Sequence, residues 1–373
     1  MQYALIALKV LAFAFGAYVV YATGMSAIVT FVLPRAAQTR ISRMVFIAVR
    51  NLLDLVAPPS RDYHERDRLF AMQAPLSLVL LPVVWLLLIL GAFTLMYWAI
   101  VGDLREAFIT SGSSMLTLGF ARPDRLSTTA LSFAQAAMGL GLVALLISYL
   151  PTIYAGFSRR ETLVALLEAL AGSPPTPATL LARTHRIGYT DRLDELWRAW
   201  EVWFADIEES HTSLSAVVFF RSPDPDRSWV TAAGCVLDTA ALLTSTVDRP
   251  RSPEAQLCIR AGFVALRRIT DFFGYPHNDE PTPDDPIAVT REEFDAVCEE
   301  LATAGLPLLA DRDQCWRDFK GWRVNYDTVL RFLAGVTTAP PHPWSGDRAI
   351  GFKSPPFWMA WRLTQTRHRH RQS

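Results

Sequence analysis

The chain has 373 residues, of which 51% are hydrophobic and 19% are charged, and its formal net charge is zero. This length allows two or three domains, and the composition predicts that only part of the chain lies in lipid. Zero net charge gives no electrostatic case for binding nucleic acid. The four cysteines (Cys235, Cys258, Cys298 and Cys315) are irregularly spaced without a CxxC pair. We therefore expect buried free thiols, not a zinc site or a disulfide framework.

The first apolar segment runs from Ala4 to Leu33, and Lys9 is its only charged residue. A membrane-crossing helix needs about 20 residues, so this segment is long enough to cross. A cleaved signal peptide is the alternative. It is disfavoured because no basic residue precedes the apolar run and because the run is too long. We expect residues 1–34 to form an N-terminal transmembrane helix.

Residues 35–72 form an arginine-rich linker with seven arginines. Apolar residues between positions 41 and 55 recur at helical spacing, with Arg40, Arg43 and Arg50 among them. This pattern predicts an amphipathic helix whose cationic face contacts an anionic membrane leaflet. A helix packed on the protein's own cytosolic domain is an equally good interpretation.

Two further apolar segments, Pro75 to Ile100 and Thr129 to Gly156, are predicted to cross the membrane. The arginine-rich linker belongs in the cytoplasm by the positive-inside rule. Three spans then place the N-terminus and the loop 101–128 outside the cell. Everything after Phe157 lies in the cytoplasm.

Between these two spans lies the stretch Leu104 to Asp124, LREAFITSGSSMLTLGFARPD. It is too short and too polar to cross a membrane alone, but it has the length of a short helix, 104–115, followed by returning extended backbone. Such a re-entrant segment survives at membrane depth only where protein or water covers its backbone groups. The stretch therefore predicts a pore loop. Carbonyl oxygens of Thr117 to Phe120 would replace the hydration shell of a cation, and Ser111, Ser113 and Ser114 would hydrogen-bond behind them.

The segment Leu104 to Phe157 resembles the pore module of the tetrameric potassium-channel superfamily, in which a pore helix, a filter and an inner helix follow one another. The family filter reads Thr-Val-Gly-Tyr-Gly-Asp, with a proline shortly after it. This chain has Thr117, Leu118, Gly119, Phe120, Ala121, Arg122 and then Pro123. The resemblance implies a homotetramer with a selectivity filter at 117–121, and it implies potassium as the permeant ion.

Two positions depart from the family pattern in ways that affect selectivity. Ala121 replaces the second glycine, where a left-handed backbone would cost a residue with a side chain about 1–2 kcal/mol. Arg122 replaces the acidic residue at the outer mouth. Four such guanidinium groups would repel cations unless Asp124 or Asp103 pairs with them.

The third span is the predicted inner helix of the pore. Gln135 is the one strongly polar residue in its outer half, and such a residue tends to face a bundle interior. Gly139 and Gly141 fit either a hinge or close helix packing. Pro151 removes a backbone donor and should kink the helix near its cytoplasmic end. The candidate gate residues beside it are Leu150, Ile153 and Tyr154.

Residues 158–373 change character and show several helical patterns without a run of alternating strands. Trp197, Trp200 and Trp203 recur on one predicted helix and are assigned to a core instead of a ligand platform. No GxGxxG, Walker A, GxSxG or HExxH pattern is present. We therefore predict a helical cytosolic domain that assembles or regulates the pore, with no enzyme activity, no metal site and no cofactor other than the permeant cation.

The sequence thus predicts an all-α membrane protein of the bacterial inner membrane. It has three transmembrane helices per chain, a re-entrant pore helix with a filter loop in a pore domain at 73–157, and a helical cytosolic domain. The expected function is conduction of monovalent cations. The alternative is a channel-fold sensor or scaffold that conducts weakly or not at all, because Arg122 blocks its pore, and whose cytosolic domain binds a ligand or partner.

Overall fold

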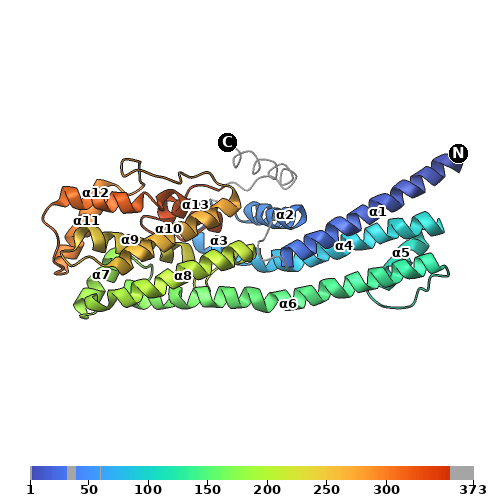
Figure 1. Cartoon of the computed structure of the whole chain (residues 1–373), viewed down its shortest axis with the longest axis horizontal. Helices are drawn as coiled ribbons and strands as arrows, with labels where there is room; N and C mark the ends of the chain where they lie inside the picture. The colour runs from blue at the N-terminus through green and yellow to red at the C-terminus, as the bar shows by residue number, and fades with distance from the viewer. Residues whose placement is uncertain (1, 32–38, 59, 353–373) are drawn as a thin grey trace. The chain divides into compact units, whose positions relative to one another are not determined.

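The structure is a computed structural model that describes residues 2–31, 39–58 and 60–352. This part of the chain is helical and contains no β-strand, only an isolated bridge between Val247 and Leu308. Three of its helical segments are long and apolar enough to cross a membrane. They are α1 (Gln2–Phe31), the stretch Tyr63–Val101 that contains α4 (Gln73–Val101), and α6 (Leu126–Ala171) (Figure 1). The predicted all-helical membrane protein is confirmed at this level.

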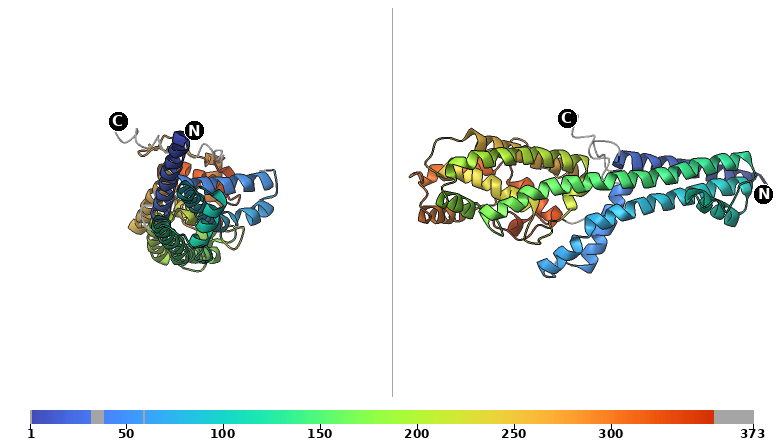
Figure 2. Two further views of the ribbon diagram at one scale, coloured as in Figure 1. Left: turned by 90° about the vertical axis from the view of Figure 1, so that its right-hand side faces the viewer. Right: turned by 90° about the horizontal axis from the view of Figure 1, so that it is seen from below.

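The described chain divides into two compact units. Unit 1 holds residues up to Val56 and 72–154, and unit 2 holds 57–71 and 155–354. The predicted linker 35–72 is therefore split, because α2 (Arg40–Val56) belongs to unit 1 and α3 (Tyr63–Phe70) to unit 2. The helix α6 passes from one unit into the other without interruption (Figure 2).

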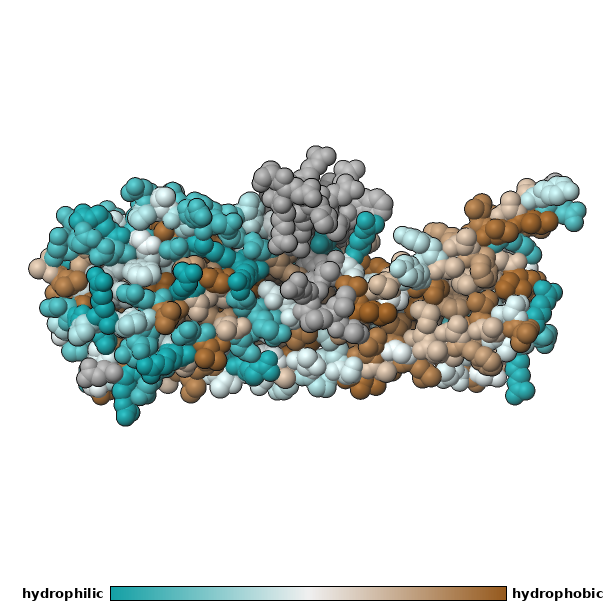
Figure 3. Space-filling model, viewed as in Figure 1, coloured by the Kyte–Doolittle hydropathy of each residue, from teal (hydrophilic) through white to brown (hydrophobic). Residues whose placement is uncertain are grey.

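In unit 1, α1 and α4 pack side by side in opposite directions. Trp85 Nε1 on α4 donates to Ser26 Oγ on α1 at 3.2 Å. Further along, a Cβ at Gly16 would lie 2.7 Å from the carbonyl oxygen of Ala92, so glycine is what permits this close approach. The outer surface of this pair is largely apolar (Figure 3), as expected of helices that face lipid.

The amphipathic helix α2 lies alongside α4. Thr39 Oγ1, just before α2, is 2.8 Å from Ser26 Oγ, and Arg50 Nη1 donates to Gln73 Oε1 at 3.3 Å. Ser26 in turn accepts from Trp85. The eleven residues from Thr39 to Arg50 and the twelve from Trp85 back to Gln73 both span about 17 Å at about 1.5 Å per residue. The two helices therefore run antiparallel over this length.

This placement changes the interpretation of the arginines on α2. Arg50 is only 6% exposed, and its Nε also faces Asp54 at 3.3 Å, so it has little surface to offer a lipid headgroup. Lipid contact through Arg40 and Arg43 stays a prediction. The exposed face of α2 is apolar instead, with Met44, Leu52 and Leu55 exposed.

Unit 2 is built around one buried helix. This helix, α9 (Trp229–Thr246), has all but one of its residues buried, as its apolar sequence on every face requires. Trp197, Trp200 and Trp203 are at most 3% exposed, which confirms their assignment to a core. All four cysteines are buried and free, also as predicted. The surrounding helices are α7 (Pro177–Arg186), α8 (Leu193–Ser213), α10 (Pro253–Phe273), α11 (Arg291–Thr303), α12 (Arg312–Arg323) and α13 (Asp327–Thr337).

A buried ion-pair network ties three of these helices together. Arg323 on α12 pairs with Asp238 on α9 and with Asp327 on α13. The distance from Arg323 Nε to Asp327 Oδ1 is 3.0 Å. The hydroxyl of Tyr326 donates to Asp238 at 2.9 Å. Removal of one partner from such a buried network typically costs about 3–5 kcal/mol, because the remaining charge is left unpaired.

We expect unit 2 to lose stability as the pH falls below about 6.5. His211 and His342 are buried, and burial lowers the pKa of each below the ordinary 6.5, with Arg160 lowering that of His211 further. Below pH 6.5 the unfolded chain binds protons that the folded chain does not, so each histidine costs up to about 1.4 kcal/mol per pH unit. Denaturant unfolding at a series of pH values between 5 and 8 gives the unfolding free energy as a function of pH. This free energy should fall less steeply with decreasing pH for His211→Gln than for the wild type. Identical pH dependence of the two proteins would contradict the role given to His211.

Candidate functional site

The short helix predicted at 104–115 is present as α5 (Leu104–Met115) and turns back directly from the end of α4. Gly102 ends α4 in a left-handed conformation (φ 92°), and the Asp103 carboxylate caps α5 by accepting the Glu106 N–H at 2.8 Å. Ser111 Oγ donates to the carbonyl of Leu90 at 3.0 Å. Leu90 lies eleven residues before the end of α4, which is about 16 Å along its axis. The helix α5 thus runs back along the second half of α4.

The other end of α5 is set against α6. A Cβ at Gly139 would lie 2.5 Å from the carbonyl oxygen of Met115, the last residue of α5. Gly139 is thirteen residues into α6, about 20 Å from its start. Gly139 is therefore a close-packing position, whereas a Cβ at Gly141 would meet no atom within 4 Å.

A buried hydrogen-bond chain joins α6, α5 and α4. Gln135 on α6 is fully buried and donates from Nε2 to Ser111 Oγ at 2.7 Å, and Ser111 donates onward to Leu90. Gln135 Oε1 has no partner among the residues that the structure describes. The inward orientation predicted for Gln135 is confirmed, and its role is to hold α5 between the two long helices.

Two more serines of α5 fix the loop that follows it. Ser113 Oγ accepts the backbone N–H of Ala121 at 3.1 Å, and Ser114 Oγ is 2.7 Å from Ser132 Oγ on α6. Of the three serines predicted to hydrogen-bond behind the loop, Ser113 does so, whereas Ser111 and Ser114 bond to α4 and α6. The loop is therefore attached to α5, and α5 to α6.

The loop backbone itself is not extended, contrary to expectation. Thr117 is left-handed (φ 54°), and so is Gly119 (φ 72°). The N–H groups of Thr117 and Leu118 donate to the carbonyls of Ser114 and Ser113 at 3.2 and 2.9 Å. This is a Schellman ending of a helix, in which the left-handed position is usually glycine. Two carbonyls of the last turn of α5, those of Ser113 and Ser114, are consequently capped by the following residues of the chain.

The backbone strain falls on a different residue from the one the sequence suggested. Ala121 is not left-handed, whereas Thr117 is, and a β-branched residue in that region is a genuine outlier. Such strain costs about 1–3 kcal/mol and persists only where surrounding contacts impose it. The residue type of Thr117 does not predict a left-handed backbone, because this conformation comes from the capping hydrogen bonds.

The tip of the loop is uncovered in the single chain. Leu116, Leu118 and Phe120 are between 57% and 67% exposed. Arg122 is exposed and has no hydrogen bond or ion pair with any residue of the described ranges, so neither Asp103 nor Asp124 neutralises it. The charge at this end is thus borne by a free guanidinium group beside an apolar tip.

The predicted gate region is a continuous part of α6. The helix runs through Pro151 without a break. Leu150 and Tyr154 are exposed, at 46% and 67%, whereas Ile153 is buried. Leu150 and Tyr154 are therefore accessible for a side-chain constriction between copies of the chain, whereas Ile153 is not.

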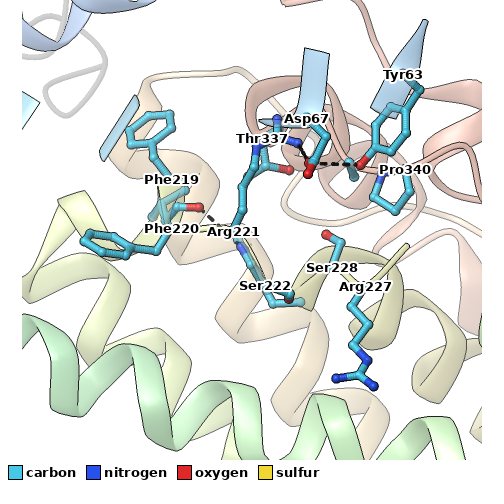
Figure 4. Close-up of a pocket in the computed structure, with 13 residues that line it drawn as sticks. Tyr63, Asp67, Phe219, Phe220, Arg221, Ser222, Arg227, Ser228, Thr337 and Pro340 are labelled. Carbon is cyan, nitrogen blue, oxygen red and sulfur yellow. Dashed lines mark hydrogen bonds and ion pairs between the residues drawn. The ribbon is translucent and has the colours of Figure 1, made fainter. Parts of the chain in front are cut away.

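Unit 2 has a separate small cavity next to α3, partly open to solvent (Figure 4). Asp67 and Arg221 line it and form an ion pair with each other, and Arg227 pairs with Glu168. Ser222 Oγ also lies there, buried and without a partner among the described residues. The charged groups of the cavity are therefore paired.

No protein-family model, no curated protein and no solved structure matches this chain. The resemblance to potassium channels therefore rests on the residues of 104–157 themselves.

Substitution of the two inner-helix glycines should separate close packing from hinge flexibility. Both Gly139→Ala and Gly141→Ala gain helix propensity of about 1 kcal/mol. Only Gly139→Ala places a methyl group against the Met115 carbonyl, at a cost of about 1–3 kcal/mol. Equilibrium unfolding in mixed detergent should show Gly139→Ala to be the less stable variant. Equal stability of the two would contradict the close contact.

Glycine substitutions in the loop should have opposite effects at two nearby positions. Thr117→Gly should stabilise the fold by about 1 kcal/mol, because glycine adopts the left-handed backbone without strain. Ala121→Gly should destabilise it by about 0.5–1 kcal/mol, because Ala121 is not left-handed and glycine adds unfolded-state entropy. The same unfolding assay measures both. Stabilisation by Ala121→Gly would overturn this account of the loop.

Proposed function

We propose that the chain is one subunit of a homotetrameric, potassium-channel-like pore in the bacterial inner membrane, and that it conducts monovalent cations through residues 117–121. The observation that carries this proposal is the depth of α5. Contacts with Leu90 and Gly139 place its end about 16–20 Å from the nearer ends of α4 and α6. That is half or more of a hydrocarbon core about 30 Å thick.

A helix that ends at this depth needs its backbone covered by protein or water. The capped carbonyls of Ser113 and Ser114 and the bond from Ala121 to Ser113 supply part of that cover. These contacts favour the interpretation of a re-entrant loop. The alternative, an interfacial turn, would need no buried attachment. In this arrangement the N-terminus and the loop lie outside the cell and unit 2 lies in the cytoplasm.

The exposed face of α6 supports assembly of several copies. Large apolar residues recur every seven positions along it, which keeps them on one side of the helix. They are 60–87% exposed and comprise Leu126, Phe133, Leu140, Ile147 and Tyr154. Four copies would cover this face together with the exposed Leu118 and Phe120, and would bring the four loops round one axis.

Within such an assembly the loop offers oxygen atoms to a cation. The hydroxyl of Thr117 already donates to the Leu116 carbonyl at 2.8 Å, so its lone pairs are available. Gly119 has no side chain to obstruct a neighbouring subunit. Backbone oxygens of this kind replace the hydration shell of an alkali cation, and potassium is the ion that the resemblance implies.

Arg122 favours a second candidate function. Its guanidinium group has no partner among the residues described, and four copies would surround the outer mouth with positive charge. The protein would then be a membrane sensor or scaffold with a channel fold, little or no conduction, and a cytosolic unit that binds a ligand or partner.

Ion flux from proteoliposomes under a potassium gradient tests both functions. We expect wild-type flux to be abolished by Gly119→Asp, which introduces a carboxylate at a left-handed backbone position, and to be increased by Arg122→Asp. Gly274 is also left-handed (φ 70°) but lies in unit 2, so Gly274→Asp is a control for the general effect of a strained aspartate.

The pattern of fluxes separates the two candidates. Flux in Arg122→Asp but not in the wild type would support the sensor with an electrostatic block. No flux in any variant of a folded tetramer would reject conduction through this loop. Wild-type flux that survives Gly119→Asp would place the conducting path elsewhere.

A further inference from the structure

Two parts of unit 2 continue along the chain into unit 1, namely α3 and the second half of α6. One short segment of unit 2 contacts both of them. The segment 217–221 follows α8 and includes the end of the 3-10 helix η2 (Ser215–Phe219). Its carbonyl groups accept hydrogen bonds from α6. Arg160, which is fully buried on α6, donates from Nη1 to Val217 at 2.9 Å and from Nη2 to Phe220 at 2.7 Å.

The last residue of the segment, Arg221, holds α3. The guanidinium group of Arg221 pairs with Asp67 of α3, and the two side chains are only 11% and 10% exposed. Its Nη2 donates to the carbonyl of Thr337 at 2.7 Å. The hydroxyl of Tyr63, also on α3, donates to the carbonyl of Pro225 at 3.0 Å. Figure 4 shows Tyr63, Asp67 and Arg221 gathered on one side of the cavity.

We propose that 217–221 is a coupling segment that holds α3 and α6 together, so that unit 2 acts on two pore helices at once. The path to the pore is covalent. The helix α3 ends at Phe70 and α4 begins at Gln73, while α6 is one helix from Leu126 to Ala171. A change in unit 2 that moves the segment therefore displaces the outer and the inner helix in concert. The effect on conduction rests on the proposed channel function, but the coupling itself does not.

The chemistry of the contacts suits a segment that transmits force. A buried arginine that is hydrogen-bonded to two carbonyls and a buried ion pair both resist separation, since each leaves an unpaired polar group when it breaks. The same segment borders the cavity with Val218 and Phe219. Its middle is held as well, because Trp229 Nε1 donates to the carbonyl of Val218 at 3.3 Å. The segment is therefore attached along its length.

Hydrogen exchange of the full-length protein in detergent tests the coupling. Asp67→Asn keeps the shape of the side chain but removes its charge, and we expect exchange in α3 to accelerate by about tenfold or more. The decisive peptide is 157–165 on α6, which Asp67 does not touch. Coupling predicts faster exchange there too, whereas a local role of Asp67 predicts a change confined to α3.

Glu254→Gln is the matched control. Glu254 pairs with Arg198 between α8 and α10, away from α3 and α6, and its substitution should leave both peptides unchanged. If Asp67→Asn fails to fold, Tyr63→Phe removes only the hydroxyl bonded to Pro225 and should give the same pattern with a smaller increase. Wild-type exchange at 157–165 in a folded variant with a loosened α3 overturns the proposal.

Potassium flux of the same variants separates the two proposals. Altered flux in Asp67→Asn with normal flux in Glu254→Gln is the result expected if the coupling reaches the pore. If no variant conducts, the channel function fails while the exchange data still decide the coupling. Faster exchange at 157–165 with unchanged flux rejects control of the pore by this segment.

Discussion

The hydrogen-bond chain from Gln135 through Ser111 to the Leu90 carbonyl holds the candidate site together. It joins the two long helices α6 and α4 through α5, the short helix between them. In an apolar environment an unpaired amide or hydroxyl costs several kcal/mol, so these groups stay together once they are removed from water. The depth of α5, the position of Met115 against Gly139 and the path of the loop all follow from this attachment.

The loop shows how far local sequence determines such a site. The bounds of α5 were predictable, because Asp103 is a good N-cap and the polar run ends where the Thr-Leu-Gly-Phe string begins. The left-handed Thr117 was not, since a β-branched residue argues against that conformation. It is imposed by the donation of two N–H groups to carbonyls of the last turn. Sequence resemblance directed attention to Ala121, but the geometry puts the strain four residues earlier.

The linker between the first two spans shows the same limit on a larger scale. Its apolar periodicity predicts one cationic helix, which is present as α2, whereas α3 was not predicted. Their assignment to different units depends on partners distant in sequence. Arg50 is held by Gln73 on α4, whereas Asp67 is held by Arg221, 154 residues further along. Pro58 and Pro59 mark the end of α2 locally, but the assignment of the two helices to different units has no local signal. The three helices long enough to cross a membrane were predictable from the length of their apolar runs, and the tryptophan core from its helical periodicity.

Arg122 is the feature on which the two candidate functions differ, and simple electrostatics limits what it does. A unit charge about 10 Å from a cation in bulk water contributes about 0.4 kcal/mol before screening by salt. Four guanidinium groups at that distance would lower the local cation concentration about tenfold, and physiological salt would screen part of this effect. Asp124, two residues away and also exposed, offsets it further in a wide, water-filled mouth. Only a mouth narrow enough to exclude water would let Arg122 block the pore. In the proposed channel, an exposed arginine at this end of the loop would therefore reduce conductance without sealing the pore.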